Sequence, residues 1–244
     1  MNTQHNPLPQ DPTSLSGLQS QALAPADERI FLRNVFGWMT LGVLFSAGAS
    51  AWMVSSSVRI ATFANNTLLW LGLVVAELVM VIALSAAIQK LPLLIARILF
   101  LAYALLTGVT LSVLIAMAGS ANVAMAFVGA AGVFGGMAAW GWTTKKSLEG
   151  WGPVLFGSLI GLLLANIVYM FTGGAVFNLI LGCLGVFIFA GFTAWDMKKI
   201  RQLGNELQAD SDQADRMAIL GALALYLDFV NLFVSLLRIF ASSR

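Results

Sequence analysis

The stretch "GALALYLDFVNLFVSLLRIF", residues 221–240, decides the class of fold. Its only formally charged residues are Asp228, near its centre, and Arg238, near its end. An apolar run of about 20 residues is the length that an α-helix needs to cross the ~30 Å hydrocarbon core of a bilayer. The stretch therefore predicts a membrane-spanning helix that keeps a carboxylate in its middle.

The composition of the whole chain indicates the same environment. Hydrophobic residues make up 59% of the 244 residues and charged residues only 10%, whereas a soluble domain usually carries about 25% charged residues. Such a chain cannot cover itself with a solvated surface, so the lipid bilayer is its expected partner. The net charge of +2 gives no reason to expect nucleic acid.

Apolar segments of similar length fill most of the remaining chain, between charged residues and turn residues. Only the connector before the last segment, residues 196–216, is long and strongly charged. The sequence thus predicts an all-α polytopic membrane protein, a seven-helix transmembrane bundle formed by residues 27–244. The predicted spans are 35–55, 67–88, 98–117, 121–142, 153–171, 175–195 and 217–240.

Residues 1–26 differ in composition from the rest of the chain. They are polar, contain proline and are short of aromatic residues, so they cannot bury enough surface to fold and we expect a disordered tail. No basic start leads directly into a short apolar core, so the segment is not a secretory signal peptide. The first span is then expected to act as an uncleaved insertion signal.

Lys and Arg residues are distributed unevenly along the predicted topology. With the N-terminus in the cytoplasm, ten of them fall on inner segments and three on the outer side, which agrees with the positive-inside rule. Seven spans then place the C-terminus outside. The inner residues are Arg29, Arg33, Lys90, Arg97, Lys145, Lys146, Lys198, Lys199, Arg201 and Arg216, and the outer ones are Arg59, Arg238 and Arg244.

Motifs for catalysis, metal binding or nucleotide binding are missing from the sequence. Cys183 is the single cysteine and has no partner for a disulfide or a metal pair, and the single His5 lies in the polar tail. The glycine-rich stretch 129–141 is typical of small-residue packing between membrane helices, and no Lys-Ser/Thr pair follows it as in a phosphate loop. The sequence therefore predicts no catalytic residue and no bound cofactor.

Two classes of membrane protein with functional residues inside the bilayer can be compared with this sequence. An intramembrane aspartyl protease also uses two aspartates on neighbouring helices, but its Gly-x-Gly-Asp motif is missing here. A retinal protein needs a lysine in its last helix, and residues 217–240 contain none. We therefore expect a protein that is not an enzyme.

The polar and small residues of the last predicted helix form one stripe. At 100° per residue they fall within an arc of roughly 100°, and leucine, valine and phenylalanine occupy the rest of the helix. A charge at the centre of a bilayer costs at least ~2.5–3.5 kcal/mol, so the stripe must face protein or water. This predicts that the last helix is the inner one. The stripe consists of Gly221, Ala224, Asp228, Asn231, Ser235 and Arg238.

Two further acidic residues fall within or at the end of predicted spans. Asp196 ends the sixth span, where it could also be an ordinary interfacial carboxylate beside Lys198 and Lys199. Counted at 1.5 Å per residue, Asp228 lies ~16 Å deeper than Asp196, so the two meet only if the sixth helix tilts or ends inside the bundle. Glu77, in the middle of the second span, has only apolar neighbours on its own helix; a functional role and a protonated structural role are both open.

Four segments of the chain together form a recognisable pattern: "YALLTGVTLS" at 103–112, "WGWTTKKSLEGWG" at 140–152, "TAWDMKKI" at 193–200 and the stretch at 221–240. This pattern resembles the Bax inhibitor-1/YccA family in its bacterial branch. The resemblance implies a seven-helix bundle with a central last helix, located in the bacterial inner membrane. It also implies a pair of aspartates, here Asp196 and Asp228, that shares a proton and gates a pH-sensitive calcium leak.

The sequence departs from the family pattern at two places near this pair. Some members carry an arginine near the inner end of the second helix, where this chain has Ile88 with Lys90 nearby. Close bacterial relatives read Asp-Thr-Gln in the sixth helix, whereas this chain reads Asp196-Met197-Lys198. Both changes alter the hydrogen-bonding groups beside the expected aspartate pair.

The oxygen-bearing side chains inside the membrane predict an ion path. Calcium prefers carboxylate and carbonyl oxygens, and the supply here is Glu77, Asp196 and Asp228, with Asn231 on the same stripe as Asp228. A leak needs weak binding, so we expect transient calcium contacts with these groups and no tight site. The alternative is a regulator without channel activity, which binds a membrane protease or another stress-response partner through its cytoplasmic face.

Overall fold

The structure is a computed structural model, and it describes residues 12–207 and 211–242. Side chains are described from residue 28 onward. The described residues form eight α-helices and no strand. The helices are α1 (Pro12–Val54), α2 (Ser57–Ala64), α3 (Thr67–Ala87), α4 (Leu93–Ala118), α5 (Ser120–Thr143), α6 (Trp151–Thr172), α7 (Ala175–Glu206) and α8 (Asp212–Ser242).

Seven of these helices are long and apolar enough to cross a membrane, as the sequence predicts. The spanning part of α1 runs over Glu28–Val54. The remaining helix, α2, is too short to cross a membrane and lies in the connector between the first two predicted spans. It begins where the Ser56 side chain accepts a hydrogen bond from the backbone N–H of Arg59, an N-cap that hydropathy alone does not reveal.

The polar segment at residues 1–26 differs in part from the expected disordered tail. Residues 1–11 lie outside the described residues, but α1 already begins at Pro12. Alanine, leucine and glutamine dominate residues 18–24, and these residues have a high intrinsic helix propensity. A stable helix that starts inside the membrane is therefore extended at its N-terminal end, because each added residue gains one backbone hydrogen bond.

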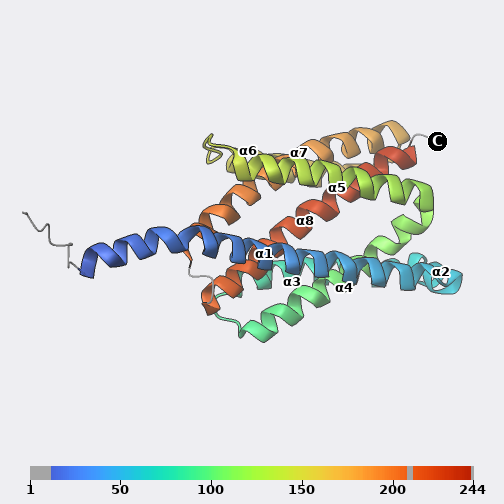
Figure 1. Ribbon diagram of the computed structural model, residues 1–244. Helices are drawn as coiled ribbons and strands as arrows, with labels where there is room; N and C mark the ends of the chain where they lie inside the picture. Colours follow the sequence, from blue (N-terminus) through green and yellow to red (C-terminus); the bar gives the residue numbers. More distant parts are fainter. Residues whose placement is uncertain (1–11, 208–210, 243–244) are drawn as a thin grey trace, which may run out of the picture.

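Helix α8 is the central helix of the bundle. It packs against α7, α5, α1 and α4, and Figure 1 shows it between α1, α3 and α4 on one side and α5, α6 and α7 on the other. Side chains buried inside the protein make up 61% of its spanning window, against 6% for α3 and 11% for α6. The prediction of an inner last helix is confirmed.

Close backbone contacts hold the outer helices to one another. Gly141 of α5 lies against the backbone of Ala194 in α7, and Gly108 of α4 lies against the backbone of Ser46 in α1. A side chain at either glycine would occupy the space of the neighbouring backbone. Within the glycine-rich stretch 129–141, Gly129 and Gly141 face other helices, whereas Gly132, Gly135 and Gly136 have open space beside them.

Ion pairs and hydrogen bonds gather at the end of the bundle where α8 begins. Arg97 of α4 pairs with Asp215 of α8 at 2.8 Å, and Arg201 of α7 pairs with Glu28 of α1 at 3.1 Å. The Trp142 indole N–H donates to the same Glu28 carboxylate at 3.2 Å. These contacts connect the ends of α1, α4, α5, α7 and α8, and they lie on the side that the sequence predicts to be cytoplasmic.

Candidate functional site

The polar stripe of α8 forms one wall of an open cavity between the helices. The cavity has a volume of ≈ 880 Å³ and lies between α3, α4, α6, α7 and α8. Most of its lining is apolar, which is typical of sites where a few polar groups determine what binds. The stripe residues on its wall are Ala224, Asp228, Asn231, Ser235 and Arg238.

Asp228 is the most buried charged residue of this cavity. It sits near the middle of α8 and is only 4% exposed. Its Oδ2 atom is buried and has no hydrogen-bond partner. An ionised carboxylate in such surroundings is costly unless a proton, a cation or a donor compensates it. The position of Asp228 therefore calls for a second group within the cavity.

Asp196 lies on the same cavity, within electrostatic reach of Asp228. It ends the sixth predicted span, but α7 continues to Glu206 and α8 begins already at Asp212. Asp196 is thus inside a long helix that is antiparallel to α8, and this reduces the ~16 Å offset in depth between the two residues. No hydrogen bond joins the two carboxylates directly among the contacts of the described residues.

Glu77 also lines the cavity, from α3 on its opposite side. It is half-buried, and its Oε1 accepts a hydrogen bond of 2.8 Å from the Thr110 hydroxyl of α4. This partner of Glu77 is a hydroxyl donor, which suits an ionised carboxylate. Asn231 lies on the α8 wall, where its amide donates to the carbonyl of Leu227.

Two cationic side chains mark opposite ends of the cavity. Lys199 lies beside Asp196, with its Nζ 4.1 Å from the centroid of the Trp195 ring. Arg238 lines the other end, where its Nη1 donates a hydrogen bond of 2.6 Å to the Asn166 Oδ1 atom of α6. The cavity therefore has carboxylates in the middle and one cation toward each end.

Two of these contributors were not predicted from the sequence. Thr110 and Asn166 are polar residues in otherwise apolar helices, a pattern that could have marked them as facing protein. Arg238 was placed on the stripe, but its partner on α6 could not be read from its own helix. The sequence contains no signal for which helix lies opposite which.

This chain has Ile88, and no arginine, near the inner end of the second spanning helix. A guanidinium from another helix, that of Arg216, lies beside this position. Arg216, in the second turn of α8, donates to the carbonyl oxygens of Ile88, Gln89 and Leu91 in the turn that follows α3. A positive charge near the last carbonyls of a helix is favourable, since these groups carry a partial negative charge. Arg216 thus holds the start of α8 to the α3–α4 turn.

The carboxylates of the cavity are not assembled into one metal site. Within the described part of the chain, no three Asp, Glu, His or Cys side chains come together closely enough to hold a metal ion. Glu77, Asp196 and Asp228 instead come from three helices around one space. Such an arrangement can offer oxygen ligands one after another, which suits passage better than storage.

Comparison with known proteins agrees with this architecture. Residues 28–244 match the family model described as "Inhibitor of apoptosis-promoting Bax1". The chain is 40% identical over 215 residues to the inner membrane protein YbhL of Escherichia coli K12, which covers 88% of this chain and 92% of that protein. Uncharacterized proteins of Borreliella burgdorferi and Deinococcus radiodurans are 37% and 38% identical, over 88% and 86% of this chain and 92% and 90% of their own. The chain therefore belongs to the Bax inhibitor-1 family of integral membrane proteins.

Proposed function

We propose that this protein is a calcium-leak channel of a bacterial inner membrane, gated by a proton that Asp196 and Asp228 share. The observation that supports this most strongly is the cavity itself. Three carboxylates from α3, α7 and α8 line one cavity between the helices, and the most buried of them has an oxygen without a hydrogen-bond partner. A second cavity, between α1, α4, α5 and α8, has no carboxylate in its lining.

The chemistry of the gate follows from the closeness of two like charges. Two ionised carboxylates within electrostatic reach repel each other strongly where the surroundings are apolar, so one shared proton is the favoured state of the pair. That proton connects α7 and α8 through Asp196 and Asp228. Its loss leaves two negative charges, which separate the helices and attract a cation, and this couples the pH to the opening of the path.

The ion that suits the path is a hard cation such as Ca²⁺. Carboxylate oxygens of Glu77, Asp196 and Asp228, with the Asn231 amide on the same wall, are the ligand type that calcium prefers. Their separation on different helices keeps binding transient. This proposal includes no resident cofactor and no catalytic step.

The test is calcium flux into liposomes that contain only this protein. The parent is expected to conduct with a rate that changes between pH 6 and 8. Asp196→Asn and Asp228→Asn keep the shape of each side chain but remove its titration, so flux through either variant should lose most of its pH dependence. Glu149→Gln, at an exposed loop residue away from the cavity, is the matched control and should behave as the parent does.

Two results would contradict the proposal. Unchanged pH dependence in both Asp196→Asn and Asp228→Asn would exclude the shared-proton gate. Absence of calcium flux in the correctly folded parent would exclude the channel, and it would favour the alternative that the protein is a membrane-bound regulator of a protease or stress-response partner. Copurification of such a partner from the native membrane would then be the next measurement.

A further inference from the structure

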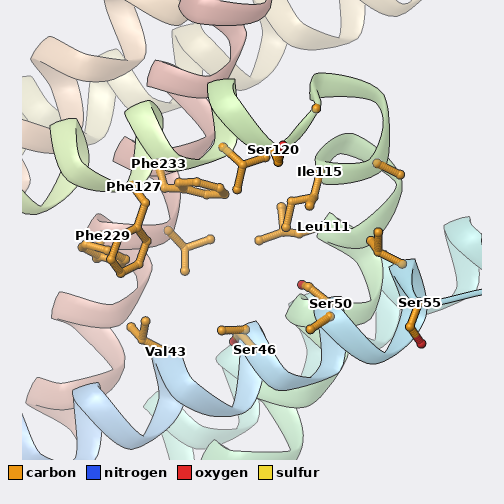
Figure 2. A pocket seen from close by; sticks show the side chains of 18 residues that line it. Val43, Ser46, Ser50, Ser55, Leu111, Ile115, Ser120, Phe127, Phe229 and Phe233 are labelled. Carbon is orange, nitrogen blue, oxygen red and sulfur yellow. The ribbon is translucent and has the colours of Figure 1, made fainter.

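A second cavity lies on the opposite side of α8 from the carboxylates. It is an elongated groove with a volume of ≈ 730 Å³, bounded by α1, α4, α5 and α8. Figure 2 shows Phe229 and Phe233 of α8 and Phe127 of α5 on one side of this groove and the serines of α1 on the other. Except for four serines and one glycine, every residue that lines it is apolar.

The serines inside the groove do not make it a polar site. Ser46 donates to the carbonyl of Ala104 at 2.7 Å and shares a 2.6 Å hydrogen bond with the Tyr226 hydroxyl, while Ser50 donates to the carbonyl of Gly108 at 2.6 Å. The hydroxyl hydrogens of Ser46 and Ser50 are thus used within the protein. An occupant of this part of the groove finds no free hydroxyl donor at these two serines and meets an otherwise apolar lining, which favours an apolar occupant.

The groove opens sideways, toward the bilayer. Val54 of α1 is 39% exposed and Phe127 of α5 is 46% exposed, and both lie on its rim. Along α1 the groove extends from Val43 to Ser55, which corresponds to ~18 Å at the rise of an α-helix. This length is close to one leaflet, about half of a ~30 Å hydrocarbon core. The apolar molecules at this depth of a membrane are lipid acyl chains.

A cation lies at the end of the groove that faces α2. The Nη2 atom of Arg59 donates to the Ser55 hydroxyl and to the Trp52 carbonyl, each at 2.6 Å, and the guanidinium lies 4.4 Å from the centroid of the Trp52 ring. Ser55 itself lines the groove. The buried Nε of Arg59 has no hydrogen-bond partner. A fixed arginine beside a tryptophan at the end of a span is typical of the membrane interface, where lipid phosphates lie.

We propose that this groove binds one anionic phospholipid from the leaflet on the α2 side, with an acyl chain along α1 and α5 and the phosphate at Arg59. The match of an apolar, leaflet-long groove with a single cation at its outer end supports a lipid over a water-soluble ligand. The inference is independent of the calcium path, because it uses the other face of α8.

Lipid binding can be measured by native mass spectrometry of the full-length protein purified in detergent and titrated with phosphatidylglycerol or phosphatidylcholine. The parent is expected to bind one phosphatidylglycerol about fivefold more tightly than phosphatidylcholine, the contribution of one arginine near a lipid headgroup. Arg59→Gln should abolish this preference. Ala47→Trp fills the middle of the groove and should weaken the binding of both lipids by about tenfold, since an indole then occupies the space of the chain.

Matched controls keep the result specific. Leu44→Trp adds the same ring on an exposed face of α1 outside the groove, and Lys90→Gln removes a charge at the opposite end of the bundle; both should bind as the parent does. If Ala47→Trp does not fold, Ala124→Trp fills the groove from α5. Equal binding in parent and groove-filling variants, or equal losses in Leu44→Trp, would overturn the proposed site. An unchanged preference in Arg59→Gln would overturn the assignment of the phosphate to Arg59.

Discussion

Arg238 of α8 donates a hydrogen bond of 2.6 Å to Asn166 of α6, at one end of the carboxylate-lined cavity. The bond holds a positive charge at one end of the ion path that we propose. Because the residue is half-buried, this charge is screened less than one at the protein surface. In the proposed channel, this charge would oppose the passage of a cation at that end for as long as the bond persists.

This relationship predicts a faster leak when the charge is removed. Arg238→Gln should raise calcium flux in liposomes by about tenfold, since a repulsion of ~1.4 kcal/mol corresponds to that factor in rate. Arg238→Lys keeps the charge and should change flux much less. A rate in Arg238→Gln equal to that of the parent would show that cations bypass this end of the cavity.

The contribution of Glu77 is predicted to depend on its carboxylate and not on its shape. Glu77→Gln keeps a partner for the Thr110 hydroxyl but removes the charge, so calcium flux should fall several-fold while circular dichroism stays unchanged. Thr110→Val removes the hydrogen bond and keeps the charge, and it should affect flux less. If Glu77→Gln conducts like the parent across pH 6 to 8, Glu77 is structural and the path runs elsewhere.

The contact between α5 and α7 predicts opposite effects of the same substitution at two glycines of one helix. Gly141→Ala places a methyl group into the backbone of Ala194 and should lower thermal stability, with a loss of 1–3 kcal/mol as is usual for overpacked sites. Gly136→Ala meets open space and should be neutral or stabilising by up to ~1 kcal/mol, because alanine favours the helix. Similar melting temperatures for both variants in detergent would contradict the observed packing.

The charges at the end of the bundle where α8 begins predict the orientation of the protein in the membrane. Arg97, Arg201 and Arg216 gather there, so this end should face the cytoplasm. A reporter that is active only in the periplasm should be inactive when fused within the α5–α6 loop, next to Lys145 and Lys146, and active when fused between α2 and α3. The reverse pattern would show that the chain is inserted the other way round.

Much of the fold could be predicted from sequence because hydropathy reports directly on the membrane. The seven spans and the inner position of α8 follow from apolar length and from one polar stripe, and neither requires knowledge of the neighbours. The ends of the helices could not be predicted in this way. Polar residues extend α7 to Glu206 and start α8 at Asp212, since helical hydrogen bonds continue beyond the hydrocarbon core.

The candidate site could be predicted only as a set of residues. Glu77, Asp196, Asp228 and Asn231 all line one cavity, because an intramembrane polar residue must face protein or water. Their partners could not be predicted, since contacts such as Thr110 with Glu77 depend on how α3 and α4 are rotated against each other. The apolar groove also left no trace in the sequence, because its lining residues look like ordinary lipid-facing or core positions.

The central position of α8 has a consequence for biosynthesis. Translation proceeds from the N-terminus, so α1 to α7 are inserted before the helix that contacts α1, α4, α5 and α7 is available. Until α8 is inserted, the helix faces that it will cover have to contact lipid or pack temporarily against one another. The bundle can therefore be completed only after the last span is inserted. A chain that stalls before Asp212 would lack the helix that joins the others, and its unpaired helix faces would be accessible to the cell's quality-control proteases.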